Sequence, residues 1–105
     1  GKTMKTINEV REDLKEIRYY CSKQKDFENA ARTVGSSTAV EKVKAYNEAI
    51  KTAPIRLYDL YVSLYVNNNT QAVVAEDWGL TSDYVRKMTK KLYEYFISEF
   101  SKRGE

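Results

Sequence analysis

Residues 71–90, QAVVAEDWGLTSDYVRKMTK, are the most informative part of the chain, because their pattern fits a helix, a tight turn and a second helix. Ala75 is a small residue at the point where two crossing helices would touch. Gly79, four positions on, tolerates the positive φ that a tight turn requires. Five apolar side chains occupy the positions that lock two such helices at a steep angle: Val74, Trp78, Leu80, Val85 and Met88. With seven constrained positions filled in one window, the sequence predicts a helix-turn-helix.

The second helix of this unit would carry its polar side chains on the outer face: Thr81, Ser82, Asp83, Arg86, Lys87 and Lys90. In a helix-turn-helix, these positions enter the major groove of duplex DNA. Arg86 and Lys87 are suitable donors to base acceptors, especially those of guanine. Thr81, Ser82 and Lys90 are better suited to phosphates, where contacts position a protein without reading sequence. The expected site is therefore a DNA-binding face.

Asp83 is the exception on this face, because a carboxylate repels phosphate. It fits only if it accepts a hydrogen bond from a cytosine amino group, or pairs with Arg86 or Lys87 three or four residues on. From residue 67 to residue 105, six basic residues balance six acidic ones, so this half has no overall attraction for DNA. Helix-turn-helix geometry also occurs in proteins that bind only protein. The alternative function is therefore a helical interaction module, such as an assembly or packaging adaptor.

The sequence on either side of residues 71–90 predicts further helices with clear ends. Residues 55–66 form an apolar helix after Pro54, and the last helix runs from Ser82 to about Lys102. Hydroxyl side chains are expected to cap the two helices of the motif, Thr70 the first and Thr81 the second. Earlier in the chain, residues 40–50 form a helix that ends at Thr52-Ala53-Pro54.

The N-terminal part predicts one long helix from about Thr6 to Val34. Its apolar residues recur at alternating spacings of three and four: Ile7, Val10, Leu14, Ile17 and Cys21. The charged residues between them are mixed in sign and read as a solvated face. Gly35-Ser36-Ser37-Thr38 ends this helix. The expected fold is thus an all-α bundle of about five helices in a single domain, 1–105, with an N-terminal helical extension (1–52) and a helix-turn-helix region (53–105).

Aromatic residues extend the apolar surface of the last helix beyond the motif, and at helical spacing such residues are most often core or interface. Leu92, Tyr93, Phe96, Ile97 and Phe100 must be buried against the N-terminal helices or against a second subunit. A homodimer, formed through the N-terminal helix or this aromatic face, would let two recognition helices reach half-sites one helical turn apart.

Composition excludes several other functions. The 105 residues carry a net charge of +3, 42% hydrophobic and 31% charged residues, which is typical of a globular chain whose charge permits a nucleic-acid partner. One cysteine and no histidine cannot supply a structural zinc site, and no phosphate loop or nucleophile motif is visible, so we expect no metal, no cofactor and no enzyme activity. Cys21 reads as a small buried residue, and its usage fits a cytoplasmic protein. No apolar run is long enough to cross a membrane.

The run LYDLYVSLYVNNNTQAVVAEDWGLTSDYVRKMTKKLYEYF, residues 57–96, resembles the C-terminal DNA-binding region of sigma factors and the ArpU-type late-gene regulators of phages. Those proteins place a Leu- and Tyr-bearing helix before a helix-turn-helix whose recognition helix begins at serine, as at Ser82. The N-terminal half is similar only in outline. The resemblance implies transcription regulation through promoter DNA, with RNA polymerase as a further partner. It also implies a DNA-facing set: Thr81, Ser82, Arg86, Lys87 and Lys90.

Overall fold

The computed structural model describes residues 5–22 and 37–103, and all the regular structure in these ranges is helical. The elements are α1 (Ile7–Ser22), α3 (Ser37–Ile50), α4 (Ile55–Tyr61), the π-helical turn η1 (Val62–Val66), α5 (Gln71–Trp78) and α6 (Ser82–Lys102). The expected all-α class with about five helices is confirmed. The expected continuation of the first helix to Val34 lies outside the described residues.

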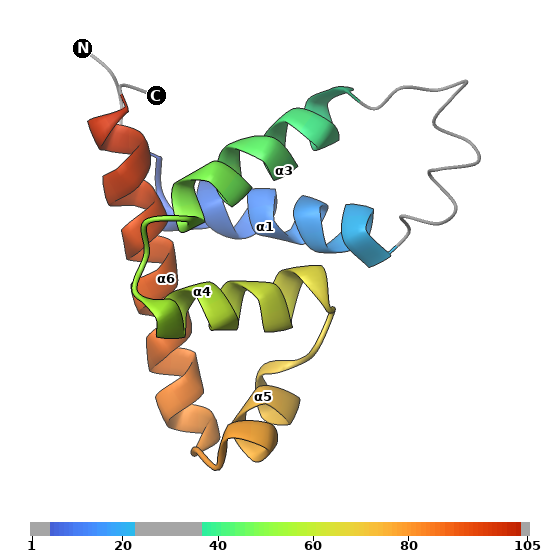
Figure 1. Ribbon diagram of the computed structural model, residues 1–105, viewed down its shortest axis with the longest axis vertical. Helices are drawn as coiled ribbons and strands as arrows, with labels where there is room; N and C mark the ends of the chain where they lie inside the picture. Colours follow the sequence, from blue (N-terminus) through green and yellow to red (C-terminus); the bar gives the residue numbers. More distant parts are fainter. Residues whose placement is uncertain (1–4, 23–36, 104–105) are drawn as a thin grey trace.

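The long helix α6 runs along one side of the molecule, and the other helices pack against it (Figure 1). In the figure, α3, α1 and α4 lie one below another across α6, while α5 lies beside the first turns of α6. The whole measures 43 × 38 × 22 Å along its principal axes. The two ends of α6 therefore have different neighbours: α5 at its start, and the N-terminal helices further along.

The core is continuous through all of these helices. Its members share exposures of 6% or less: Val10, Leu14, Ile17, Tyr46, Ala49, Ile50, Leu60, Tyr61, Leu64, Tyr65, Val74, Ala75, Val85, Met88, Leu92, Phe96 and Phe100. An aromatic cluster of Tyr46, Tyr61, Phe96 and Phe100 lies at its centre. The ring centroid of Phe96 is 4.7 Å from that of Tyr46 and 5.7 Å from that of Tyr61, in edge-to-face geometry. Burial of such large rings is the main stabilisation of this end of α6.

Asp13 is a buried carboxylate that joins α1 to α3. The Tyr46 hydroxyl donates to its Oδ2 at 2.6 Å, and the ammonium groups of Lys5 and Lys42 each lie 3.2 Å from one of its oxygens. Burial alone raises the pKa of Asp13, but the hydrogen bonds from Tyr46 and Lys42 and the charge of Lys5 together hold this pKa below its ordinary value. The same contact, added to burial, raises the pKa of Tyr46. The hydrogen bond between Asp13 and Tyr46 thus links α1 to the aromatic cluster, and the charge of Asp13 is balanced by the two lysines.

Arg18 of α1 braces the segment that leads into α5. The Asn67 N–H donates to the Val62 carbonyl at 2.8 Å, five residues back, which is the π-helical pattern. The Arg18 guanidinium donates to the carbonyl of Leu64 at 3.0 Å and to that of Asn69 at 3.4 Å. It also lies 5.1 Å from the ring centroid of Tyr65. The predicted helix at residues 55–66 is confirmed in its bounds. Its final turn is π-helical, and Arg18 of α1 satisfies the Leu64 carbonyl in this turn.

Candidate nucleic-acid interface

Both helices of the predicted motif begin at the expected capping residues. The Thr70 hydroxyl accepts a hydrogen bond from the Val73 N–H at 3.1 Å, at the start of α5. The Thr81 hydroxyl accepts one from the Tyr84 N–H, also at 3.1 Å, at the start of α6. Each bond satisfies a backbone donor that the first helical turn leaves without a partner. The predicted caps are confirmed.

Gly79 forms the turn between α5 and α6 in the left-handed conformation, with φ 68°. The Leu80 N–H donates to the Ala75 carbonyl at 2.8 Å, and the Gly79 N–H donates to the Glu76 carbonyl at 3.3 Å. This pair of bonds is a Schellman motif, which ends a helix and turns the chain sharply. A Cβ at position 79 would meet no atom within 4 Å. The glycine is therefore required by backbone conformation and not by space.

Apolar side chains hold α5 against α6 on the inner side of the turn. Val74 and Ala75 of α5 and Val85 and Met88 of α6 are buried, as the sequence predicts. Trp78 is half-buried, and the guanidinium of Arg56 lies 5.3 Å from its ring centroid. This apolar contact surface fixes how α6 leaves the turn.

All six residues of the predicted DNA-binding face are exposed: Thr81, Ser82, Asp83, Arg86, Lys87 and Lys90. The buried residues of the same turns, Val85, Met88 and Thr89, face the core, and the Thr89 hydroxyl donates to the Val85 carbonyl at 2.8 Å. The first turns of α6 therefore have one apolar side and one side of hydroxyl and charged groups. We call the six exposed residues the outer face of α6.

The carboxylate of Asp83 pairs with both cations next to it on the outer face. Arg86 forms a hydrogen-bonded ion pair with Asp83, and the Lys87 Nζ lies 3.4 Å from an oxygen of Asp83. All three side chains are more than half exposed. Solvent-exposed pairs of this kind are weak, so a polyanion could displace the carboxylate at little cost. Of the two roles that the sequence leaves open for Asp83, the structure shows the ion pairing.

Tyr84 also lies at this surface, although aromatic residues at helical spacing are most often core or interface. Its side chain is 51% exposed, in the first turn of α6. The helical position explains this, because Val85 next to it takes the buried side of the turn. The apolar surface further along α6 differs: Leu92, Phe96 and Phe100 are buried within this chain, whereas Tyr93 and Ile97 are only partly buried. The expected burial is therefore confirmed for three of the five residues. Covering these three requires no second subunit.

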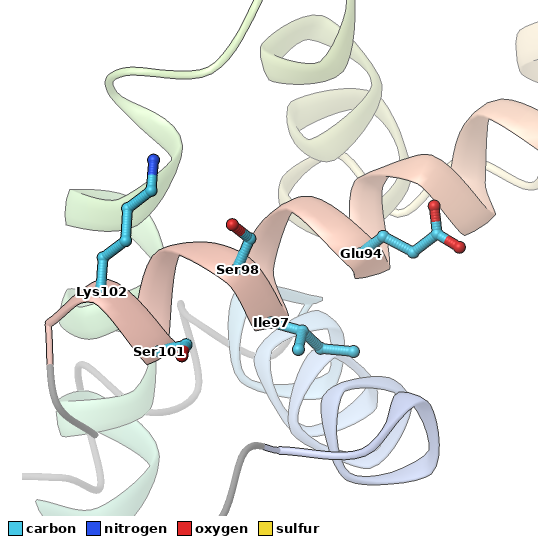
Figure 2. A pocket seen from close by; sticks show the side chains of 5 residues that line it. All are labelled: Glu94, Ile97, Ser98, Ser101 and Lys102. Carbon is cyan, nitrogen blue, oxygen red and sulfur yellow. The ribbon is translucent and has the colours of Figure 1, made fainter.

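A separate hollow lies near the other end of α6 (Figure 2). Its described lining comes from α6 alone: Glu94, Ile97, Ser98, Ser101 and Lys102. Within residues 5–22 and 37–103, no three Cys, Asp or Glu side chains are grouped closely enough to hold a metal ion. The helices in these ranges also include none long and apolar enough to span a bilayer. The outer face of α6 remains the candidate interface, because the residues that the sequence predicts to bind DNA are all exposed there.

Comparison with known proteins adds no relative to this picture. A scan of protein families, a search of curated proteins and a search of solved structures each found no match to the chain.

Proposed function

We propose that this protein binds duplex DNA by placing the first turns of α6 in the major groove, and that it regulates transcription as the ArpU-type phage regulators do. The supporting observation is the joint between α5 and α6. Gly79 in the left-handed conformation, with its two backbone hydrogen bonds, turns the chain so that α5 braces α6 from one side. Helix-turn-helix proteins use this arrangement to project a recognition helix.

The chemistry of the outer face agrees with this use. Arg86 and Lys87 are long, exposed donors suited to acceptors on base edges. Thr81 keeps its hydroxyl proton available after accepting from Tyr84, and Ser82 is exposed beside it. Such groups at the start of a helix donate readily to phosphate oxygens. In this proposal Arg86 and Lys87 read bases, while Thr81, Ser82 and the ammonium group of Lys90 hold the backbone.

Binding must displace Asp83 from its two cations. The displaced carboxylate then either turns to solvent or accepts a hydrogen bond from a cytosine amino group. RNA polymerase as a second partner, and a homodimer that spans two half-sites, belong to the same proposal.

The test is fluorescence anisotropy of a labelled duplex of roughly 25 base pairs, more than two helical turns, titrated with protein at several salt concentrations. We expect binding whose log K falls linearly with log salt, with a slope of about −0.9 for each phosphate contacted. Arg86→Glu and Lys87→Glu should abolish this binding. Selection from a pool of random duplexes would then identify the preferred site.

Lys44→Glu is the matched control, because Lys44 is an exposed lysine of α3 and forms no ion pair with any residue that the structure describes. It changes the net charge as much as the other two variants do and should leave most of the affinity intact. Circular dichroism checks that all three variants keep their helices. If the wild-type protein binds no duplex even at low salt, the proposal fails, and a protein partner for the helical surface becomes the function to pursue.

A further inference from the structure

The charges of α1 are sorted onto two sides of the helix. Arg11, Lys15 and Arg18 follow one another at spacings of four and three, which keeps them within a sector of about 60°. The acidic residues Glu12 and Glu16 occupy a neighbouring sector, and Glu16 pairs there with Lys42 of α3. The basic side of α1 faces α5, because Arg18 bonds the carbonyl of Asn69 just before that helix.

Two adjoining hollows connect this basic side to the outer face of α6. The described lining of the first is Arg11, Lys15, Arg18, Tyr65, Thr70, Gln71, Ala72 and Tyr93. That of the second is Ile7, Arg11, Gln71, Arg86, Thr89, Lys90 and Tyr93. They share Arg11, Gln71 and Tyr93. The described linings of the two hollows, taken together, contain five different cationic side chains and no carboxylate. The positive surface therefore continues from Arg86 across to Lys15.

The cations along this surface differ in how far other groups already engage them. Arg18 is held by two carbonyls and the Tyr65 ring, so it is structural. Arg11 and Lys90 form no ion pair with any described residue, and both are exposed. Lys15 has one partner, Glu12 at 3.4 Å, in a pair more than 60% exposed on each side. Arg11, Lys15 and Lys90 are thus available to an anion from outside.

We propose that Arg11 and Lys15 of α1 bind backbone phosphates of the same duplex whose major groove receives α6. The inference rests on the proposed function and extends it to a helix outside the α5–α6 unit. A row of exposed cations that runs from Arg86 past Lys90 and Arg11 to Lys15 suits a polyanion better than a single small anion. Because phosphate contacts are independent of sequence, α1 adds affinity and orientation, and base reading remains with α6.

The experiment measures the salt slope of duplex binding for the full chain in the single variants Arg11→Gln and Lys15→Gln and in their combination. Lys44→Gln is the matched control for each single variant, because each of these three variants removes one positive charge. Two duplexes of unrelated sequence, each roughly 25 base pairs, serve as probes. We expect the slope of the double variant to become shallower by about 0.9 for each lost contact, close to 2 in total. Affinity should fall by the same factor on both duplexes, while Lys44→Gln leaves the slope unchanged.

The outcomes separate this inference from the proposed function. If the double variant keeps the wild-type slope while Arg86→Glu abolishes binding, the α1 contact is overturned and DNA binding by α6 stands. An equal loss of slope in Lys44→Gln would show a general effect of net charge, and would also overturn the α1 contact. If the wild-type protein binds neither duplex, both proposals fall together. Glutamine suits a helix, and circular dichroism checks that the fold of each variant is intact.

Discussion

The two ends of the continuous helix α6 differ in burial and in how their charged groups are paired. Toward its C-terminus, Phe96 and Phe100 are buried among the rings of the aromatic cluster, and the nearby charge of Asp13 has three partners. At its N-terminus, the buried residues next to the turn are Val74, Ala75, Val85 and Met88, and among the described residues the charges of Arg86 and Lys87 pair with Asp83 of the same exposed face.

This difference indicates which charges contribute to the stability of the fold and which are free to bind a ligand. A charge that is buried and fully partnered cannot be given up to a ligand without leaving its partners unsatisfied. A charge in an exposed pair is released at a cost of about 1 kcal/mol or less. One end of α6 is therefore expected to hold the fold, and the other to bind.

Replacing one aromatic residue at each end of α6 is expected to give the largest difference in the free energy of unfolding. Phe96→Ala removes a fully buried ring and should lower the free energy of unfolding by about 4 kcal/mol. Tyr84→Ala, at the exposed end of the same helix, should change it by about 0.5 kcal/mol or less. Urea denaturation followed by circular dichroism measures both. Equal losses would contradict the division of α6 into two ends.

The buried carboxylate should give the next largest effect. Asp13→Ala leaves the Tyr46 hydroxyl and two lysines without their shared partner, at a cost of about 3 kcal/mol. Asp77→Ala is the control, since that carboxylate is exposed on α5 and has no ion pair within the described part of the chain. Denaturation at neutral pH compares the two variants.

The pH dependence of stability provides an independent check on Asp13. Its pKa is lower in the folded chain than in the unfolded one, so its contribution is present above the unfolded value of about 4 and is lost as pH falls through the folded value. The difference in unfolding free energy between the wild-type protein and Asp13→Ala should therefore shrink in acid. A difference that stays constant down to pH values well below 4 would contradict the ion-paired state.

Substitution at the turn tests how α5 positions α6. Gly79→Ala forces a side chain into the left-handed region and should cost about 1 kcal/mol of stability. Gly79→Asn should cost less, because asparagine tolerates that conformation. If the turn sets the direction of α6, duplex affinity should follow the same order: wild type, then Gly79→Asn, then Gly79→Ala. An alanine variant as stable as the wild type would contradict the backbone requirement.

The smallest expected effect lies on the outer face. Asp83→Asn frees Arg86 and Lys87 and should raise affinity for an arbitrary duplex roughly threefold, the equivalent of one exposed ion pair. Glu94→Gln removes an exposed acid further along α6 and serves as the control. Weaker binding by Asp83→Asn would instead indicate that the carboxylate contacts a base directly. Anisotropy titrations at one fixed salt concentration are sufficient for this comparison.

Local signals in the sequence were enough to predict the helices from residue 55 onward and their ends. The start of α3 was predicted less well, because this helix begins at Ser37, inside the Gly35-Ser36-Ser37-Thr38 segment that the pattern assigns to a helix end. Thr70, Gly79 and Thr81 act on backbone groups within five residues of themselves, so their roles can be read from spacing alone. The exposure of the outer face follows in the same way, because burial of Val85 and Met88 fixes the orientation of every other residue in those turns.

Contacts between distant segments could not be predicted in this way. Arg18 bonds a carbonyl 46 residues away, and Asp13 meets Tyr46 at a separation of 33. Nothing in the local pattern of α1 distinguishes these two charges from solvated ones. The basic side of α1, formed by Arg11, Lys15 and Arg18, is a different case, because the spacing of four and three between these residues is visible in the sequence. It was read as part of a mixed solvated face, since the partner of that face was unknown.

The contacts of Arg18 also bear on whether the half of the chain that contains α5 and α6 could be transplanted. A recombination junction near residue 53 would separate this guanidinium from the Leu64 and Asn69 carbonyls that it holds. The transplanted half would also lack α1, which packs against both η1 and α6. Residues 53–105 are therefore not expected to fold stably when they are transferred alone to another protein. We expect natural variants of this protein to keep the two halves of the chain together.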